Sequence, residues 1–368
     1  MRMRSAEFWL RLLVFWMIAA ALTPARFRES AKDEAPYFST VDSAYAGAAD
    51  INDEGLAKKI ADTQAYYQTK YKSAAEEVNK TFGIDFYAMK AEFDATMNQY
   101  GMKQSLIDKI EDPIEKNLKM KELEQEYQDP RLYQYIEAYY YFENEVEKDH
   151  EFVGELLTRL ENILELATQK DACFRYLFNS PEFRKEFGLC VKRVVWGGNT
   201  SLQSVSAETT PLNVHSVFGD KTKLPILIKF TPLAFTSLPF LRSIMIHELN
   251  HVCFYKDPQF SDVTKFSGGA TQKAEGEHTH YFKTLNPFNP TYQYHLIHEY
   301  YSFKTQLIFN KRVPDSPLFK LDDANLKNTQ GMLDWSYSQL SDSNKQFVKE
   351  HPDPPIMRWL DQFYGKKA

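Results

Sequence analysis

The sequence predicts an α+β protein in which an all-helical region precedes a small sheet and a second group of helices. From residue 51 to about residue 170, apolar residues recur at spacings of three, four or seven, as in amphipathic helices. Between residues 190 and 230 the pattern changes to short, β-rich, roughly alternating segments. Helical periodicity returns at Phe240, and again after an irregular stretch from residue 255 to residue 290.

The first 23 residues are typical of a targeting segment. Arg2 and Arg4 form a basic start, and an uninterrupted apolar run extends from Leu12 to Leu22. This run is shorter than the ~20 residues that span a bilayer, which favours a secretory signal peptide. A membrane anchor over residues 8–23 and a buried helix are the alternatives. We therefore expect the protein to be exported, either periplasmic or secreted, or to be attached to a membrane.

The rest of the chain divides into three parts. Residues 24–50 are polar and aperiodic and indicate a linker. Residues 51–170 predict a helical domain, and residues 171–368 predict the domain that carries the chemistry. Helix-breaking residues interrupt the apolar stripes of the helical domain at four places: Gly83, Gly101, Asp112-Pro113 and Asp129-Pro130.

Composition argues against nucleic acid as a partner and does not decide whether the cysteines form a disulfide. The formal net charge is −6 and no long basic run occurs, so nucleic acid is not an expected partner. An apolar fraction of 43% and a charged fraction of 26% are ordinary for a globular protein. In an oxidising compartment Cys173 and Cys190 would pair, and the alternative is two buried thiols. Cys253 is expected to pack in the core.

Several short segments before Phe240 predict a sheet that leads into a helix. Pro225 suits the start or the edge of the last strand. The candidate strands are Val191–Trp196, a partner at Ser201–Ser206, Val214–Phe218 and Leu224–Phe230.

The helix predicted over Phe240–Phe254 contains the motif His-Glu-x-x-His. His247 and His251 are four residues apart and share one helical face, so both imidazoles reach one ion. Glu248 lies one residue further round, where it would take a proton from an activated water. Apolar residues surround the motif, which predicts a buried helix, and buried His and Glu side chains need partners. We interpret the motif as a metal site rather than as two core histidines.

A third ligand is required, because a catalytic zinc takes three protein ligands and leaves one position for water. Glu299 is the preferred candidate, since it belongs to a second predicted helix over Tyr292–Asn310. Ser302 is small enough to let that helix approach the first closely. The alternative ligands lie in the preceding loop or one turn before Glu299: Glu275, Glu277, His278, His280 and His295.

Residues 190–311 resemble the gluzincin branch of zinc metallopeptidases. The resemblance lies in the order of a strand-rich segment, His247-Glu248-x-x-His251, and a second helix with Glu299-Tyr300-Tyr301-Ser302. The resemblance implies a zincin-like domain with one Zn²⁺ on His247, His251 and Glu299, and Glu248 as general base. It also implies that the strand Ile226–Phe230 binds an extended substrate by β-addition. The chain departs from the thermolysin-type pattern at two positions: His298 precedes the glutamate, and Phe303 replaces the aspartate that orients a zinc ligand.

We therefore expect a zinc metallopeptidase that hydrolyses peptide bonds of a peptide or protein substrate with a Glu-activated water. Two other functions stay open. One is a zinc amidohydrolase acting on cell-wall peptides, and the other is a non-catalytic helical binding protein with a degenerate metal site. Candidates for stabilising the oxyanion are Tyr281, Tyr292, Tyr294, Tyr300, Tyr301, His215, His278 and His280.

Overall fold

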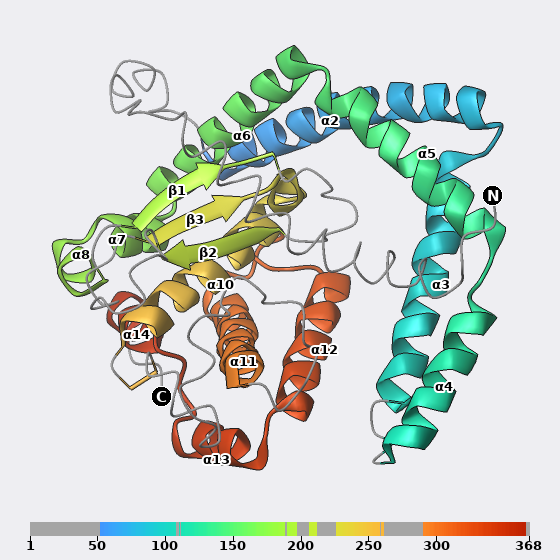
Figure 1. The fold of residues 1–368 in the computed structure, drawn as a ribbon. Helices are drawn as coiled ribbons and strands as arrows, with labels where there is room; N and C mark the ends of the chain where they lie inside the picture. The colour runs from blue at the N-terminus through green and yellow to red at the C-terminus, as the bar shows by residue number, and fades with distance from the viewer. Residues whose placement is uncertain are drawn as a thin grey trace. The chain divides into compact units, whose positions relative to one another are not determined.

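The expected α+β class is confirmed: a computed structural model consists mostly of helices with one three-stranded sheet among the residues it describes (Figure 1). The structure describes residues 52–107, 110, 112–187, 190–196, 206–211, 226–257, 259–260 and 290–365. The leader, the linker, the predicted strand at 214–218 and the loop with Glu275 to Tyr281 lie outside these residues. None of the helices searched within the described part is long and apolar enough to cross a membrane.

The described chain forms two compact units. Unit 1 comprises residues 65–156, and unit 2 comprises residues 53–64 and 157–365. The chain passes from one unit to the other within two long helices, α2 (Asp53–Phe82) and α6 (His150–Lys170). Each unit is described separately below.

Unit 1 is helical, as the apolar stripes predict, and its helices begin and end largely at the predicted breaks. Helix α2 ends before Gly83, which has a φ of +65° that favours glycine. The carboxylate of Asp112 caps α4 (Pro113–Glu126) by accepting from two backbone N–H groups. Asp129 caps α5 (Pro130–Glu147) in the same way, with one backbone donor.

The expected break at Gly101 is wrong. Helix α3 extends from Phe86 to Ile107 and passes through Gly101 without interruption. One interior glycine costs a helix only about 1 kcal/mol, and packing offsets that cost. The neighbouring Tyr100 is buried against Leu123 and Tyr127 of the α4 region. Tertiary contacts therefore decide the outcome at this position.

Aromatic side chains form much of the core of unit 1. Phe86 of α3 lies over Tyr135, Tyr139 and Phe142 of α5, with ring centroids 4.6 to 6.4 Å apart. Tyr135 and Tyr139 are themselves buried, so these two tyrosines of α5 contribute to helix packing.

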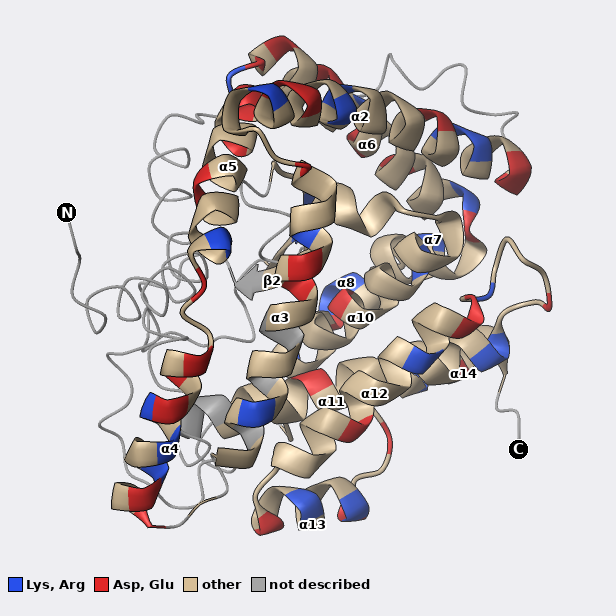
Figure 2. Ribbon diagram, turned by 90° about the vertical axis from the view of Figure 1, so that its right-hand side faces the viewer, with Lys and Arg blue, Asp and Glu red and all other residues tan. Residues whose placement is uncertain are grey.

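Helix α4 carries charged side chains of both signs, and Lys119 pairs with Glu122 (Figure 2).

The sheet of unit 2 differs from the predicted order of strands. Strand β1 (Cys190–Val194) pairs in parallel with β3 (Ile226–Phe230), and β2 (Ala207–Pro211) pairs with β3 on its other side, antiparallel. The order is therefore β1-β3-β2. The predicted partner strand at 201–206 is not found at its one described residue, Ser206, and β2 begins immediately after it.

The central position of β3 contradicts the expectation that this strand binds substrate by β-addition. Both edges of β3 are already hydrogen-bonded, one to β1 and one to β2. Addition of a peptide strand requires unpaired backbone groups at an edge. Among the described strands, β1 and β2 each offer such an edge on the side away from β3.

The helices of unit 2 surround the helix that carries the motif. Helix α10 (Leu238–Lys256) lies below the sheet in Figure 1, and α11 (Pro290–Arg312) packs against it. Alternate residues of β3, namely Ile226, Ile228 and Phe230, are buried. The other helical segments are α7 (Ala172–Asn179), α8 (Pro181–Phe187), η3 (Pro232–Phe235), α12 (Asp323–Gln339), α13 (Asp342–Glu350) and α14 (Met357–Tyr364).

The three cysteines are all free thiols. Cys173 lies in α7 and Cys190 in β1, so the structure favours the alternative of unpaired thiols for these two. Cys253 is completely buried in α10, which confirms its expected place in the core.

Candidate metal centre

Helix α10 begins and ends at well-defined caps that fix the motif in the core. The hydroxyl of Ser237 accepts a hydrogen bond from the backbone N–H of Phe240, and Asp257 is the C-cap residue. Fifteen of its nineteen residues are buried, including both histidines and the glutamate of the motif. The motif therefore lies on a helix that is enclosed on nearly all sides, as its apolar surroundings predict.

Helix α11 brings Glu299 to the two histidines. The Nε2 atoms of His247 and His251 are 3.1 Å apart. The carboxylate of Glu299 lies 3.4 Å from Nε2 of His247 through Oε2, and 3.6 Å from Nε2 of His251 through Oε1. Residues more than 40 positions apart in the sequence thus converge, and these three side chains form a group whose ligand atoms lie within 4.8 Å of one another.

The donor set fits a zinc ion in both chemistry and spacing. Two imidazole nitrogens and one carboxylate are the ligands of a common class of catalytic zinc site. Bonds of about 2.0–2.1 Å in a tetrahedral arrangement place ligand atoms roughly 3.3 Å apart. The two Nε2 atoms are 3.1 Å apart, and each lies 3.4 or 3.6 Å from one of the two carboxylate oxygens of Glu299. His247, His251 and Glu299 are therefore a group that could hold a metal ion.

Behind His247, the ring nitrogen that faces away from the group has its own partner. Nδ1 of His247 is 3.0 Å from Oε1 of Gln306, and Nε2 of Gln306 donates to the hydroxyl of Ser243 over 2.8 Å. Phe303 occupies the place of the aspartate in the resembled pattern, and its ring packs edge-on against His247 with centroids 4.9 Å apart. Phe303 makes an apolar contact there, and Gln306 provides the polar one.

Behind His251, the contacts are also uncharged. Nδ1 of His251 is 3.2 Å from Nδ1 of His298 and 3.4 Å from the hydroxyl of Ser302. Asn250 donates to the same hydroxyl over 3.1 Å, so Ser302 of α11 contacts two residues of α10. This agrees with the expectation that a small residue at position 302 permits close packing. Nε2 of His298 is buried and has no hydrogen-bond partner among the described residues.

Glu248 is held apart from the three ligand atoms. Its Oε2 accepts a hydrogen bond of 2.6 Å from the hydroxyl of Thr209 on β2. Burial raises the pKa of the Glu248 carboxyl to about 7, although His247 and the Thr209 hydroxyl act in the opposite direction. A carboxyl group with a pKa near neutrality exchanges protons readily at physiological pH.

Charge in the group is concentrated on Glu299. Burial opposes ionisation of this carboxyl, but the hydrogen bond from His247 and the neighbouring histidines hold its pKa well below the ordinary value. Burial lowers the pKa of His251 to about 3 and the pKa of His298 well below its ordinary value. Burial lowers the pKa of His247, but the Glu299 carboxylate outweighs burial and the pKa is raised above its ordinary value. His251 and His298 are therefore neutral imidazoles, the form that binds metal.

The structure also describes one alternative ligand and three of the tyrosines proposed to stabilise the oxyanion. His295 lies 3.5 Å from Oε1 of Glu299, outside the group of three and more exposed than its members. The hydroxyl of Tyr301 donates to the carbonyl of His351, so this tyrosine is already engaged in packing α11. Tyr294 packs its ring against His298. Tyr300 stacks near Tyr337.

Several candidates for a third ligand or for the oxyanion lie outside the described residues, or have side chains that the structure does not describe. These are His215, Glu275, Glu277, His278, His280, Tyr281 and Tyr292.

Two contacts of the site were not predicted from the sequence. Thr209 belongs to a polar stretch, Ala-Glu-Thr-Thr-Pro, that lacks a strong strand pattern. Gln306 lies seven residues after Glu299, at a spacing that puts both on one face of α11. This shared face is the sequence signal for Gln306, since a residue two turns after Glu299 points to the same side of the helix.

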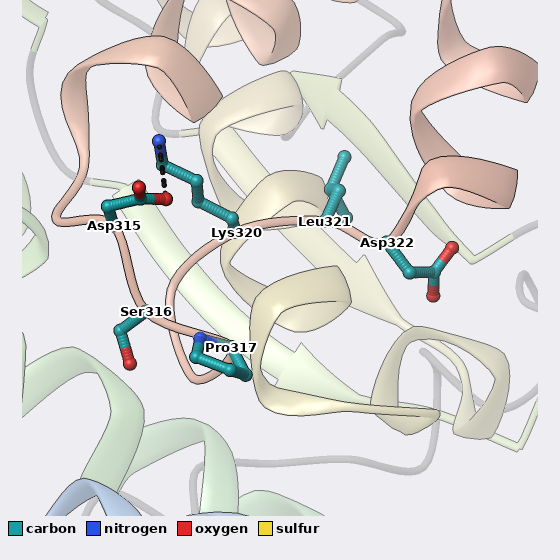
Figure 3. A pocket seen from close by; sticks show the side chains of 6 residues that line it. All are labelled: Asp315, Ser316, Pro317, Lys320, Leu321 and Asp322. Atoms are coloured by element: carbon teal, nitrogen blue, oxygen red, sulfur yellow. Dashed lines mark ion pairs between the residues drawn. The ribbon is translucent and has the colours of Figure 1, made fainter.

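A separate hollow lies on the connection between α11 and α12 and is not part of this group. Figure 3 shows the residues that line it: Asp315, Ser316, Pro317, Lys320, Leu321 and Asp322. Asp315 and Lys320 pair at 3.1 Å, and Asp322 caps α12. These contacts account for its charged side chains as parts of the local fold.

Searches against family models, curated proteins and solved structures find no match to this chain.

Proposed function

We propose that the protein is a zinc-dependent hydrolase of peptide bonds, with His247, His251 and Glu299 as the metal ligands. The observation that carries this proposal is the convergence of two imidazole nitrogens and one carboxylate, with ligand atoms within 4.8 Å of one another, which suits a single ion. Zinc bound there would act as a Lewis acid that activates water and polarises a carbonyl group. The gluzincin-like order of these residues in the sequence supports the same assignment.

Glu248 is the proposed general base. It is buried beside the ligand group, and its Oε2 is oriented by Thr209 at 2.6 Å. In peptide hydrolysis it would take a proton from the attacking water and give it to the leaving amine. A site that merely stabilised the fold would need no buried carboxyl group at this position, because an unpaired carboxyl is costly to bury.

The edge of β2 is the proposed place for an extended substrate. This strand pairs with β3 on one side, and among the described strands no other lies beside it. Thr209, which contacts the proposed base, belongs to β2. A peptide added antiparallel or parallel to this edge would gain backbone hydrogen bonds and would run past Glu248.

Metal analysis and peptide cleavage test the proposal together. We expect one zinc per chain in the unsubstituted protein, and loss of zinc in Glu299→Ala. Glu248→Gln should keep the zinc and lose cleavage of a mixed peptide library. Absence of bound metal from the unsubstituted protein would refute the proposal.

Zinc without cleavage of any peptide would favour a non-catalytic metal-binding protein. Cleavage of a muropeptide, with no cleavage of the library, would identify the amidohydrolase alternative.

A further inference from the structure

We propose that Gln306 is the residue that positions His247 for metal binding, in place of the aspartate that the resembled pattern has at position 303. The inference rests on the proposed function for the identity of the metal. It assigns to Gln306 a positioning role that holds one ring nitrogen of His247 protonated and the other free to bind.

The first support is the arrangement of the two helices. Ser243 and His247 lie one turn apart on α10, and Glu299 and Gln306 lie two turns apart on one face of α11. His247 therefore lies between two groups from α11. Glu299 faces its Nε2 at 3.4 Å, and Gln306 faces its Nδ1 at 3.0 Å.

The second support is the direction of the hydrogen bonds. The amide nitrogen of Gln306 donates to the Ser243 hydroxyl over 2.8 Å, so its carbonyl oxygen faces His247. A carbonyl oxygen only accepts, so Nδ1 of His247 must carry the proton. Nε2, which faces Glu299 at 3.4 Å and Nε2 of His251 at 3.1 Å, is then the nitrogen that would bind the metal, in exchange for the proton that it shares with Glu299 in the metal-free protein.

The third support is burial. The exposed fractions of Gln306 and Ser243 are both 3%, and that of His247 is 7%. Because the described surroundings shield this chain of contacts from water, loss of the amide would leave a buried ring N–H without an acceptor. Phe303 does not replace it, since its ring offers only an apolar edge contact.

The assignment has a chemical consequence for the site. A carboxylate behind a ligating histidine raises the basicity of the ligand, whereas an amide orients the ring without adding charge. The contacts behind His251, to His298 and Ser302, are neutral as well. The negative charge available to the metal is thus confined to Glu299, with Glu248 beside it.

The test compares two buried glutamines of the same helix in the full-length chain. Gln306→Leu removes the contact with His247. Gln293→Leu is the matched control, because Gln293 is also buried in α11 but bonds to Gln339, Ser341 and Asn344. Zinc affinity is measured by competition with a chromophoric chelator. We expect Gln306→Leu to bind zinc about 10- to 100-fold more weakly, and Gln293→Leu to bind as the unsubstituted protein does.

A second measurement uses the metal-free protein. The ¹⁵N chemical shifts of His247, assigned by their loss in His247→Ala, should identify a proton on Nδ1. This tautomer should persist in Gln306→Glu, which keeps the acceptor and should bind zinc at least as tightly as the unsubstituted protein. It should be lost in Gln306→Leu.

Unchanged affinity together with an Nδ1 proton that is kept in Gln306→Leu would overturn the inference, and so would an Nδ1 without a proton in the unsubstituted protein. The tautomer is read without metal, so it decides the role of Gln306 even if the protein binds no zinc or cleaves no peptide. Those two results would instead refute the proposed function.

Discussion

Replacement of Arg242 by methionine should strongly destabilise unit 2 by breaking a buried ion-pair network. Arg242 lies on α10, five residues before His247, and is 1% exposed. Its guanidinium lies 3.0 Å from the carboxylate of Asp171 and 2.9 Å from that of Asp53. It also donates to the carbonyl of Leu318 over 2.8 Å.

The expected loss follows from what the substitution leaves behind. Burial raises the pKa of Asp171, and Arg242 is the main group that opposes this effect. Without the arginine, a carboxyl group with a side chain only 10% exposed loses its cation. Breaking a buried pair by removing one partner costs about 3–5 kcal/mol. With a urea slope of about 2 kcal/mol/M, the midpoint of unfolding should fall by roughly 1.5–2.5 M.

Urea unfolding followed by tryptophan fluorescence measures this loss in unit 2. Of the five tryptophans, Trp196, Trp335 and Trp359 belong to unit 2, and residues 65–156 of unit 1 contain none. Trp9 and Trp16 lie outside the described residues and are replaced by phenylalanine in every variant compared. Lys320→Met is the control for an exposed pair, since Lys320 bonds the exposed Asp315, and it should cost less than about 1 kcal/mol.

Adding Asp171→Asn to Arg242→Met should recover part of the loss, because the double variant lacks the unpaired charge. A midpoint for Arg242→Met no lower than that of Lys320→Met would refute this reasoning.

Three further predictions concern the base, the metal and a turn. Thr209→Val removes the hydroxyl that donates to Glu248 and should lower kcat/KM for peptide cleavage about 10- to 100-fold, with zinc content unchanged. Thr209→Ser keeps a hydroxyl and should retain activity. Equal rates for the two variants would contradict the role of the hydroxyl. Zinc retention in dialysis should fall as the pH is lowered below about 6, because His247 and His251 bind metal only when deprotonated. Retention that does not depend on pH would argue against histidine ligands. Gly83→Ala should destabilise unit 1 by about 1–2 kcal/mol in thermal unfolding, because the residue has a φ of +65° that alanine disfavours. No atom lies within 4 Å of the added methyl group, so the cost comes from the backbone and not from a clash. An unchanged melting temperature would contradict this cost.

The two helices that bear the candidate ligands could be predicted from the sequence because their signals are local. His247, Glu248 and His251 share a helical spacing within an apolar segment, and Glu299 belongs to the next strongly periodic segment. Their predicted helices match α10 and α11 to within a few residues at each end.

The arrangement of the sheet could not be predicted in the same way. Strand β2 is short and polar, and its stability comes from pairing with β3 rather than from its own residues. The parallel pairing of β1 with β3 joins segments more than 30 residues apart, so no turn in the sequence specifies it. The resemblance implies substrate binding at β3, and only the pairing of both its edges in the folded sheet contradicts that expectation.

The contacts behind the histidines depend on tertiary structure as well. Gln306 reaches Ser243 and His247 only because α11 packs against α10, and its spacing from Glu299 in the sequence shows a shared helical face without identifying either partner. Gly101 shows the same dependence in unit 1, where packing of Tyr100 maintains a helix that local propensity would interrupt.

The near-complete burial of α10 has a consequence for the order in which folding and metal binding occur. A helix with fifteen buried residues is ordered by the core, so both histidines lose most of their conformational freedom when unit 2 folds. Binding of the proposed metal would then need little further ordering, unlike in zinc fingers, which fold only with their ion. Amide hydrogens around His247 and His251 should consequently exchange as slowly after chelation as before it. The metal would add stability by mass action, as any ligand of the native state does, without being required to build the fold.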